Sequence, residues 1–121
     1  MKQEYIYLVL ATSKYNPEYK TIKMGFTTNP DKRLKQLRTR NKYFEYSEMA
    51  LFKNKTKSYY YRYDEEYIHS KNTYHRVRVN RDTIPEGYTE HYEFYYMPDL
   101  YNQLVSMGYY WINEPIIEEA A

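Results

Sequence analysis

The sequence contains residues whose types suit the hydrolysis of a phosphodiester bond. Such hydrolysis needs a base that activates water, a cation that neutralises charge on the phosphoryl oxygens, and a carboxylate that holds a divalent metal such as Mg²⁺ or Mn²⁺. Arginine suits the second task because its guanidinium binds phosphate through two N–H groups, and a helical glutamate suits the third. The residues that could supply this chemistry are Tyr5, Tyr7, Lys23, Arg33, Arg38, Arg40, Glu65, Glu66, His69 and Glu93.

The composition excludes several other kinds of site. The chain has no Cys, which rules out disulfides, thiolate catalysis and Cys-based zinc sites. Its three Gly form no Gly-rich phosphate loop, and its three His lack the spacing of zinc ligands. No apolar run approaches the roughly 20 residues of a membrane span, and the first residues do not resemble a signal peptide. We therefore expect an intracellular, cytoplasmic protein, located in the host cell if the source is a virus or phage.

Charge is distributed unevenly along the 121 residues. Residues 1–44 hold ten Lys/Arg and three Asp/Glu, whereas residues 84–121 hold seven Asp/Glu and no Lys/Arg. Such asymmetry indicates polyanion binding by the basic part of the chain. A solvated helix face balanced by an acidic tail fits the same charges.

The length and the pattern of elements predict one α+β domain over residues 1–121, with a small, mainly antiparallel, three-stranded central sheet flanked by helices. The core should span about residues 4–96, followed by a C-terminal helix and tail over 97–121. Segments rich in β-branched and aromatic residues predict the strands 4–12, 21–26 and 43–52 and a last short strand over 91–97. Residues 74–80 could form a strand or an extended segment that faces a ligand. The first two strands are joined by a short loop and should pair antiparallel.

A helix should follow the hairpin and carry part of the candidate set. Thr28 or Asn29 can cap it, and it should end near Asn41. Arg33 lies four residues before Leu37, so it should border the buried stripe of this helix.

A second helix should carry the acidic candidates. Thr56 or Ser58 can cap it. Its rings at helical spacing predict a buried side made of Tyr60, Tyr63, Tyr67 and Ile68. A separate row with spacing i, i+4, i+8 contains Tyr61, Glu65 and His69.

Four short blocks, in this order, resemble the GIY-YIG nuclease superfamily, particularly its small phage and large-DNA-virus branch. They are Tyr5-Ile6-Tyr7-Leu8, Lys23-Met24-Gly25-Phe26-Thr27-Thr28-Asn29-Pro30-Asp31-Lys32-Arg33-Leu34-Lys35-Gln36-Leu37, Glu65-Glu66-Tyr67-Ile68-His69 and Glu93-Phe94-Tyr95. The second block is the most specific, and the last is short. Together the blocks extend over about residues 4–96.

The resemblance implies a metal-dependent DNA endonuclease that hydrolyses phosphodiester bonds with Mg²⁺ or Mn²⁺. It implies that Tyr7 acts near the attacking water and that Arg33 binds the scissile phosphate. It implies that Glu65 holds the metal, with Glu66 as the register-shifted alternative. His69, one helical turn later, would assist as a base or contact phosphate.

Two residues of the name motif differ in this chain. Tyr5 stands where the motif has Gly, and Lys23 stands where it has its second Tyr, as in other members of the branch. Lys23 is therefore counted with the catalytic candidates. The helix residues Lys35, Arg38 and Arg40 would follow DNA phosphates or keep the helix solvated.

Structural interpretations stand beside these roles. Tyr7 could be a core ring, Gly25 a strand end or bulge that needs close backbone approach, and Arg33 a solvated residue. Glu65 could be an i, i+4 partner of His69. At the level of the whole protein, the alternatives to an enzyme are a non-catalytic nucleic-acid-binding module on the same scaffold and a phage or viral accessory protein that binds a host protein through Tyr-rich surface. A homodimer is a further option.

Overall fold

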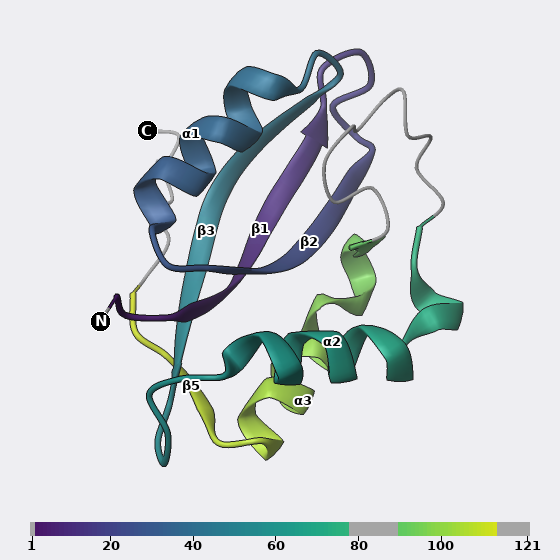
Figure 1. Cartoon of the computed structure of the whole chain (residues 1–121). Coiled ribbons are helices and arrows are strands. Elements are labelled where there is room, and N and C mark those ends of the chain that lie inside the picture. The colour runs from purple at the N-terminus through teal and green to yellow at the C-terminus, as the bar shows by residue number, and fades with distance from the viewer. Residues whose placement is uncertain (1, 78–89, 114–121) are drawn as a thin grey trace.

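The computed structural model describes residues 2–77 and 90–113 and has the expected α+β architecture (Figure 1). In chain order the elements are β1 (Tyr5–Ser13), β2 (Lys20–Thr27), α1 (Pro30–Arg40), β3 (Phe44–Asn54), α2 (Tyr61–Lys71), the 3₁₀ turn η1 (Thr73–His75), β4 (His91–Glu93), the 3₁₀ turn η2 (Phe94–Tyr96), α3 (Met97–Ser106) and β5 (Tyr109–Trp111).

The strands form one antiparallel sheet in the order β4-β2-β1-β3-β5. The expected central strands are β2, β1 and β3, and the antiparallel pairing of β1 with β2 is confirmed. The prediction of three strands was too small, because β4 and β5 extend the sheet to five. β4 lies within the last short strand that the sequence predicted, whereas β5 has only three residues, which is too short for alternation to be recognised.

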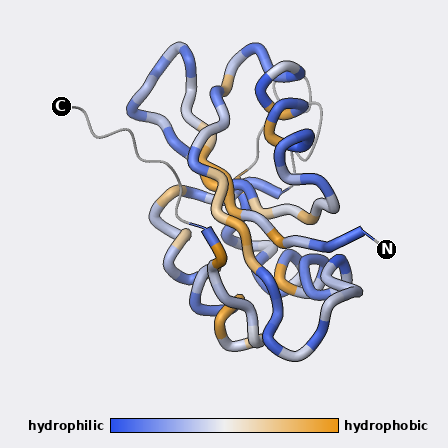
Figure 2. Tube along the Cα trace, turned by 90° about the vertical axis from the view of Figure 1, so that its left-hand side faces the viewer, coloured by the Kyte–Doolittle hydropathy of each residue, from blue (hydrophilic) through white to orange (hydrophobic). Residues whose placement is uncertain are grey.

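Helices cover both faces of the sheet. On one face, Leu37 of α1 packs in a core cluster with Tyr7 and Val9 of β1. On the other face, Ile68 of α2 and residues of α3 pack with Leu8 of β1. Since alternate residues of a strand point to opposite faces, the nearly continuous apolar run of β1 reflects burial on both sides. Figure 2 shows these hydrophobic strands in the middle of the chain trace.

The start of α1 follows from its local sequence. Asn29 is the N-cap, and its side chain accepts a hydrogen bond from the Lys32 backbone N–H at 3.2 Å, which confirms the expected cap. Pro30 occupies the first helical position, where no N–H is needed. The helix gives way to extended backbone at Asn41, as expected.

The predicted orientation of α2 was wrong. Its buried residues are Tyr61, Glu65, Ile68 and His69, so of the expected buried side only Ile68 lies inside. The rings expected to be buried are exposed, by 69% for Tyr60, 67% for Tyr63 and 51% for Tyr67. The sequence pattern was read from the rings, but the structure buries the face that carries two polar side chains of the candidate set.

The predicted caps of α2 were also wrong. The N-cap is Tyr60, which has a left-handed backbone (φ 71°) and no capping side chain. Thr56 instead donates to Asn54 Oδ1 through both its N–H and its hydroxyl.

The segment expected over 74–80 is not a strand in its described part. The 3₁₀ turn η1 and a single bridge between Arg76 and Tyr92 occupy that part of the chain.

The expectations for the remaining segments are met in part. The extended segment expected over 91–97 is a strand only in β4 and continues as η2 and the start of α3. The C-terminal helix is confirmed as α3. Residues 78–80 of the expected segment 74–80, and residues 114–121 of the expected tail, lie outside the described residues.

Candidate functional site

The candidate site lies at the edge of β2, beyond the point where β4 ends. β4 pairs with β2 over Thr21 to Lys23, and the Met24 N–H then donates to Glu90 O at 3.1 Å. In the described part of the chain, no strand pairs with this edge beyond Met24. A cleft of about 280 Å³ is found here, lined by Tyr7, Phe26, Arg33, Arg62, Glu65, Glu66 and Glu90.

Tyr7 reaches this edge from the neighbouring strand because Gly25 has no side chain. The two residues are partners in the register of β1 and β2. A Cβ atom at Gly25 would lie only 2.3 Å from Tyr7 Oη and 2.4 Å from Tyr7 Cζ. The Tyr7 ring therefore crosses β2 in the space that a side chain would fill, which explains Gly25 as a position of close approach.

Two cations hold the Tyr7 hydroxyl. Lys23 Nζ donates to Tyr7 Oη at 2.9 Å, and Arg33 Nε donates to it at 3.2 Å. A phenolic oxygen accepts through two lone pairs and donates one hydrogen. With both acceptor positions occupied, the O–H of Tyr7 is the group that remains for a molecule in the cleft.

Lys23 is completely buried and forms an ion pair with Glu90, its Nζ lying 2.5 Å from Glu90 Oε2. Burial alone would lower the pKa of Lys23, but the neighbouring Tyr7 and Glu90 raise it overall. Burial alone would raise the pKa of Glu90, but Lys23 lowers it overall. Both side chains are therefore charged at neutral pH, and each supplies the counter-ion of the other.

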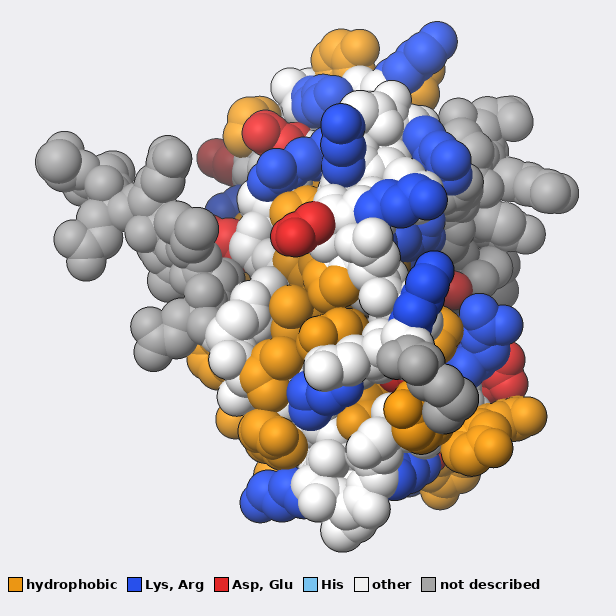
Figure 3. Space-filling view, turned by 60° about the vertical axis from the view of Figure 1, so that its left-hand side comes forward, with side chains coloured by type: hydrophobic (Ala, Val, Ile, Leu, Met, Phe, Trp, Pro, Cys, Tyr) orange, Lys and Arg blue, Asp and Glu red, His pale blue; other side chains and the backbone are white. Residues whose placement is uncertain are grey.

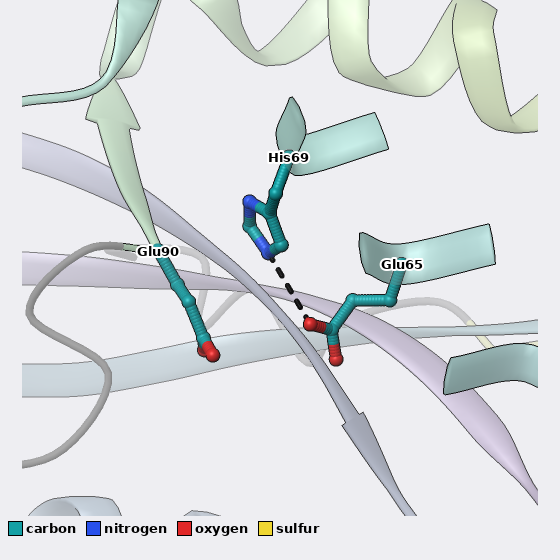
Figure 4. A group of neighbouring side chains, drawn as sticks. All are labelled: Glu65, His69 and Glu90. Carbon is teal, nitrogen blue, oxygen red and sulfur yellow. Dashed lines mark ion pairs between the residues drawn. The ribbon is translucent and has the colours of Figure 1, made fainter. Parts of the chain in front are cut away.

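Glu65 lines the cleft from α2, and His69 lies beside it, one helical turn later (Figure 4). Glu65 Oε1 lies 3.6 Å from His69 Nε2. Burial, with the charge of Glu90, raises the pKa of Glu65 to about 7. Burial lowers the pKa of His69 to about 4, so the imidazole is neutral at neutral pH and the contact is not an ion pair there. Glu65, His69 and Glu90 each place a potential metal ligand within 4.8 Å of the others.

The hydrogen bonds of His69 define its tautomer. Nε2 lies 3.1 Å from Met24 O, and Nδ1 lies 2.7 Å from Tyr92 Oη. A carbonyl oxygen only accepts, so Nε2 carries the hydrogen and Nδ1 accepts from the Tyr92 hydroxyl. His69 thus presents an N–H toward Glu65 and the β2 edge.

The other predicted residues lie farther from this centre. Glu66 is exposed and lines the cleft. Tyr5 donates its hydroxyl to Gln3. Glu93, on β4, is the strand partner of Thr21 on β2. The predicted nucleic-acid contacts on α1, namely Lys35, Arg38 and Arg40, are exposed. Arg38 Nε also donates to Tyr46 O at 2.8 Å. Figure 3 shows many Lys and Arg side chains on the part of the surface that carries α1.

Sequence reasoning missed Glu90. The signal that could have found it is Lys23, which alternates with apolar residues on a strand buried on both faces. A fully buried Lys requires a carboxylate partner, and Glu90 immediately precedes the strand that pairs with Lys23. Arg62 was also missed; its guanidinium lies over the Phe26 ring, 5.0 Å from the centroid.

By its fold and its cleft, the protein is a small α+β domain whose five-stranded antiparallel sheet carries a charged cleft at one edge. The chain belongs to the T5orf172 domain family, whose model matches residues 4–111. This domain is found in phage proteins and is associated with nuclease-type modules. No curated protein and no solved structure matches the chain. No helix in the described residues is long and apolar enough to cross a membrane.

Proposed function

We propose that the protein is a metal-dependent DNA endonuclease of the GIY-YIG type that hydrolyses phosphodiester bonds. The observation that carries the proposal is the convergence of Tyr7, Arg33 and Glu65, from β1, α1 and α2, on one cleft. Each has the type that the reaction needs, and residues from three separate elements are not brought together by local sequence alone. Membership of a nuclease-associated family supports the same function.

The residues present fit a divalent metal ion. The buried carboxylate of Glu65 has a pKa raised to about 7, which indicates that the protein leaves its negative charge poorly compensated. Carboxylate oxygens are the ligands that Mg²⁺ and Mn²⁺ prefer. Glu65 is therefore the proposed ligand, and the exposed Glu66 is the alternative. When bound, the ion would supply positive charge to the phosphoryl and leaving-group oxygens.

Protein side chains would perform the remaining tasks. Arg33, at the edge of the cleft, would bind the phosphoryl oxygens and stabilise the charge that develops on them. Tyr7 Oη would act on the attacking water in its ionised form, which Lys23 and Arg33 stabilise, and would take the proton of the water as the new O–P bond forms. Neutral His69 keeps its Nε2–H on Met24 O and its Nδ1 on Tyr92 Oη, so it would support the cleft wall beside Glu65. The exposed basic residues of α1 would follow the DNA backbone without reading its sequence.

The test is cleavage of a supercoiled plasmid with added Mg²⁺ or Mn²⁺. Wild type should nick or linearise the plasmid, and Arg33→Ala and Glu65→Gln should each lose about 10²- to 10³-fold in rate. Glu45→Gln is the matched control, because Glu45 is an exposed glutamate on β3 outside the cleft. Wild type that retains DNA with a strong salt dependence but never cuts it would instead identify a non-catalytic binding module. No retention of DNA and salt-insensitive binding to a host protein would identify the accessory-protein alternative.

A further inference from the structure

We infer that Glu90 is a positioning residue of the cleft, which holds the Tyr7 hydroxyl in place through Lys23. The inference rests on the proposed function, because it assigns Glu90 to the same reaction. Glu90 immediately precedes the edge strand β4 and is not part of the sequence motifs.

The contacts form a continuous chain from the backbone of β2 to Tyr7. The Glu90 carbonyl accepts from the Met24 N–H at 3.1 Å, which fixes Glu90 beside the β2 edge. Its carboxylate contacts Lys23 Nζ at 2.5 Å, and Lys23 Nζ donates to Tyr7 Oη at 2.9 Å. The side chain of Glu90 is 29% exposed, whereas that of Lys23 is 0% exposed, so this series of contacts runs from the cleft wall into the interior.

The Lys23 ammonium group needs Glu90 to stay directed at Tyr7 Oη. An ammonium group has three donors and a flexible stem, so its position is set by its acceptors. Here two acceptors define that position, Tyr7 Oη and Glu90 Oε2. Removal of the carboxylate charge would leave a buried cation without its counter-ion, and such a cation moves toward solvent or loses its proton. The first change breaks the bond from Lys23 to Tyr7, and the second leaves a weaker bond from a neutral amine that no longer fixes the Tyr7 hydroxyl.

The competing assignment makes Glu90 a metal ligand beside Glu65 and His69, because the three ligand atoms lie near one another. Geometry favours the positioning role. Glu90 already has a cation at 2.5 Å, and the same carboxylate would have to share its charge between Lys23 and a metal ion. His69 Nε2, the nearest nitrogen of this group, carries a hydrogen and faces Met24 O, so it does not present a lone pair to an ion that Glu90 would share.

The test is a double-mutant cycle of Glu90→Gln and Lys23→Met, read as the single-turnover cleavage rate and as the Mn²⁺ concentration at half-maximal rate. Glu90→Gln should lower the rate about 10²-fold without changing the Mn²⁺ requirement. In the Lys23→Met background the same change should have less than about a threefold effect, since its target is absent. Glu45→Gln is the matched control, because Glu45 is an exposed glutamate outside the cleft. Equal effects in both backgrounds, or an increase of about tenfold in the Mn²⁺ requirement, would overturn the inference.

A second readout does not depend on cleavage. The side-chain ammonium of a buried, hydrogen-bonded Lys exchanges its hydrogens slowly, so Lys23 should give a protected ¹⁵N-ammonium signal in lysine-labelled protein. Glu90→Gln should abolish this signal and Glu45→Gln should retain it; persistence in Glu90→Gln overturns the inference. If Glu90→Gln does not fold, the double variant, which buries no charge, should fold and cleave like Lys23→Met; a double variant that cleaves much more slowly than Lys23→Met also overturns it. Wild type that shows the signal but cuts no DNA would refute the proposed function while leaving the contact chain intact.

Discussion

Gly25→Ala should displace Tyr7 and thereby reduce both stability and cleavage. The new Cβ would lie 2.3 Å from Tyr7 Oη and 2.7 Å from Tyr7 Cε2. Ordinary contacts begin near 3.4 Å, so the ring must move by about 1 Å. Such a shift would break or lengthen the hydrogen bonds from Lys23 at 2.9 Å and Arg33 at 3.2 Å. We expect a loss of about 1–3 kcal/mol in the free energy of unfolding and about 10²-fold in cleavage rate.

The assay is urea denaturation in two backgrounds. Tyr7→Leu removes the atoms that clash, so Gly25→Ala in that background should be neutral, or stabilising by up to about 1 kcal/mol, because alanine is better than glycine in a strand. Gly108→Ala is the matched control. Its φ of 92° makes alanine strained, while its nearest contacts are ordinary at 3.5 Å, so its cost should be the same in both backgrounds. An equal cost of Gly25→Ala in both backgrounds would refute the close approach of the ring.

Three further predictions concern charge. The pKa of Glu65 is about 7 in the folded protein against 4.5 for a free glutamate, so the folded state binds more protons in this range and the unfolding free energy contributed by Glu65 falls as pH rises from about 4.5 to 7. Glu65→Gln should therefore gain up to about 3 kcal/mol on wild type between these pH values; urea denaturation at both ends checks this, and a constant difference would contradict it. Arg33→Lys should keep DNA affinity but lose about 10²-fold in cleavage, measured in single turnover, because lysine cannot bind phosphate through a planar fork; wild-type cleavage would count against the phosphate role. Lys35→Gln should reduce the slope of log affinity against log salt by about 0.9; an unchanged slope in a filter-binding series would remove Lys35 from the interface.

The first half of the fold could be predicted from local sequence because its signals are local. Asn29 and Pro30 set the start of α1, and a short loop sets the pairing of β1 with β2. Each of these signals determines the structure within a few residues of its own position. The predicted candidates Tyr7, Lys23 and Arg33 are brought together as one hydrogen-bonded group. The order of the motif blocks, rather than their composition, pointed to that group.

The second half could not be predicted in the same way because tertiary contacts decide it. Tyr60, Tyr63 and Tyr67 recur at helical spacing on one side of α2, whereas the buried side carries Glu65 and His69, so the spacing of rings alone indicates the wrong face. The structure chooses the face with Glu65 and His69, where each polar side chain has a partner or faces the cleft. Glu90 was missed for a related reason: its role depends on a short edge strand that brings it beside Lys23, 67 positions earlier in the chain.

The central claim is that Tyr7, Arg33 and Glu65 act on one phosphodiester around one metal ion. Anomalous scattering from crystals grown with Mn²⁺ and a short DNA duplex tests it most directly. We expect a Mn²⁺ peak at about 2.0–2.4 Å from a Glu65 carboxylate oxygen, with a DNA phosphate within hydrogen-bond distance of Arg33 and the Tyr7 hydroxyl facing the same phosphate. A Mn²⁺ peak elsewhere on the molecule, or a DNA backbone that passes over α1 without entering the cleft, would contradict it.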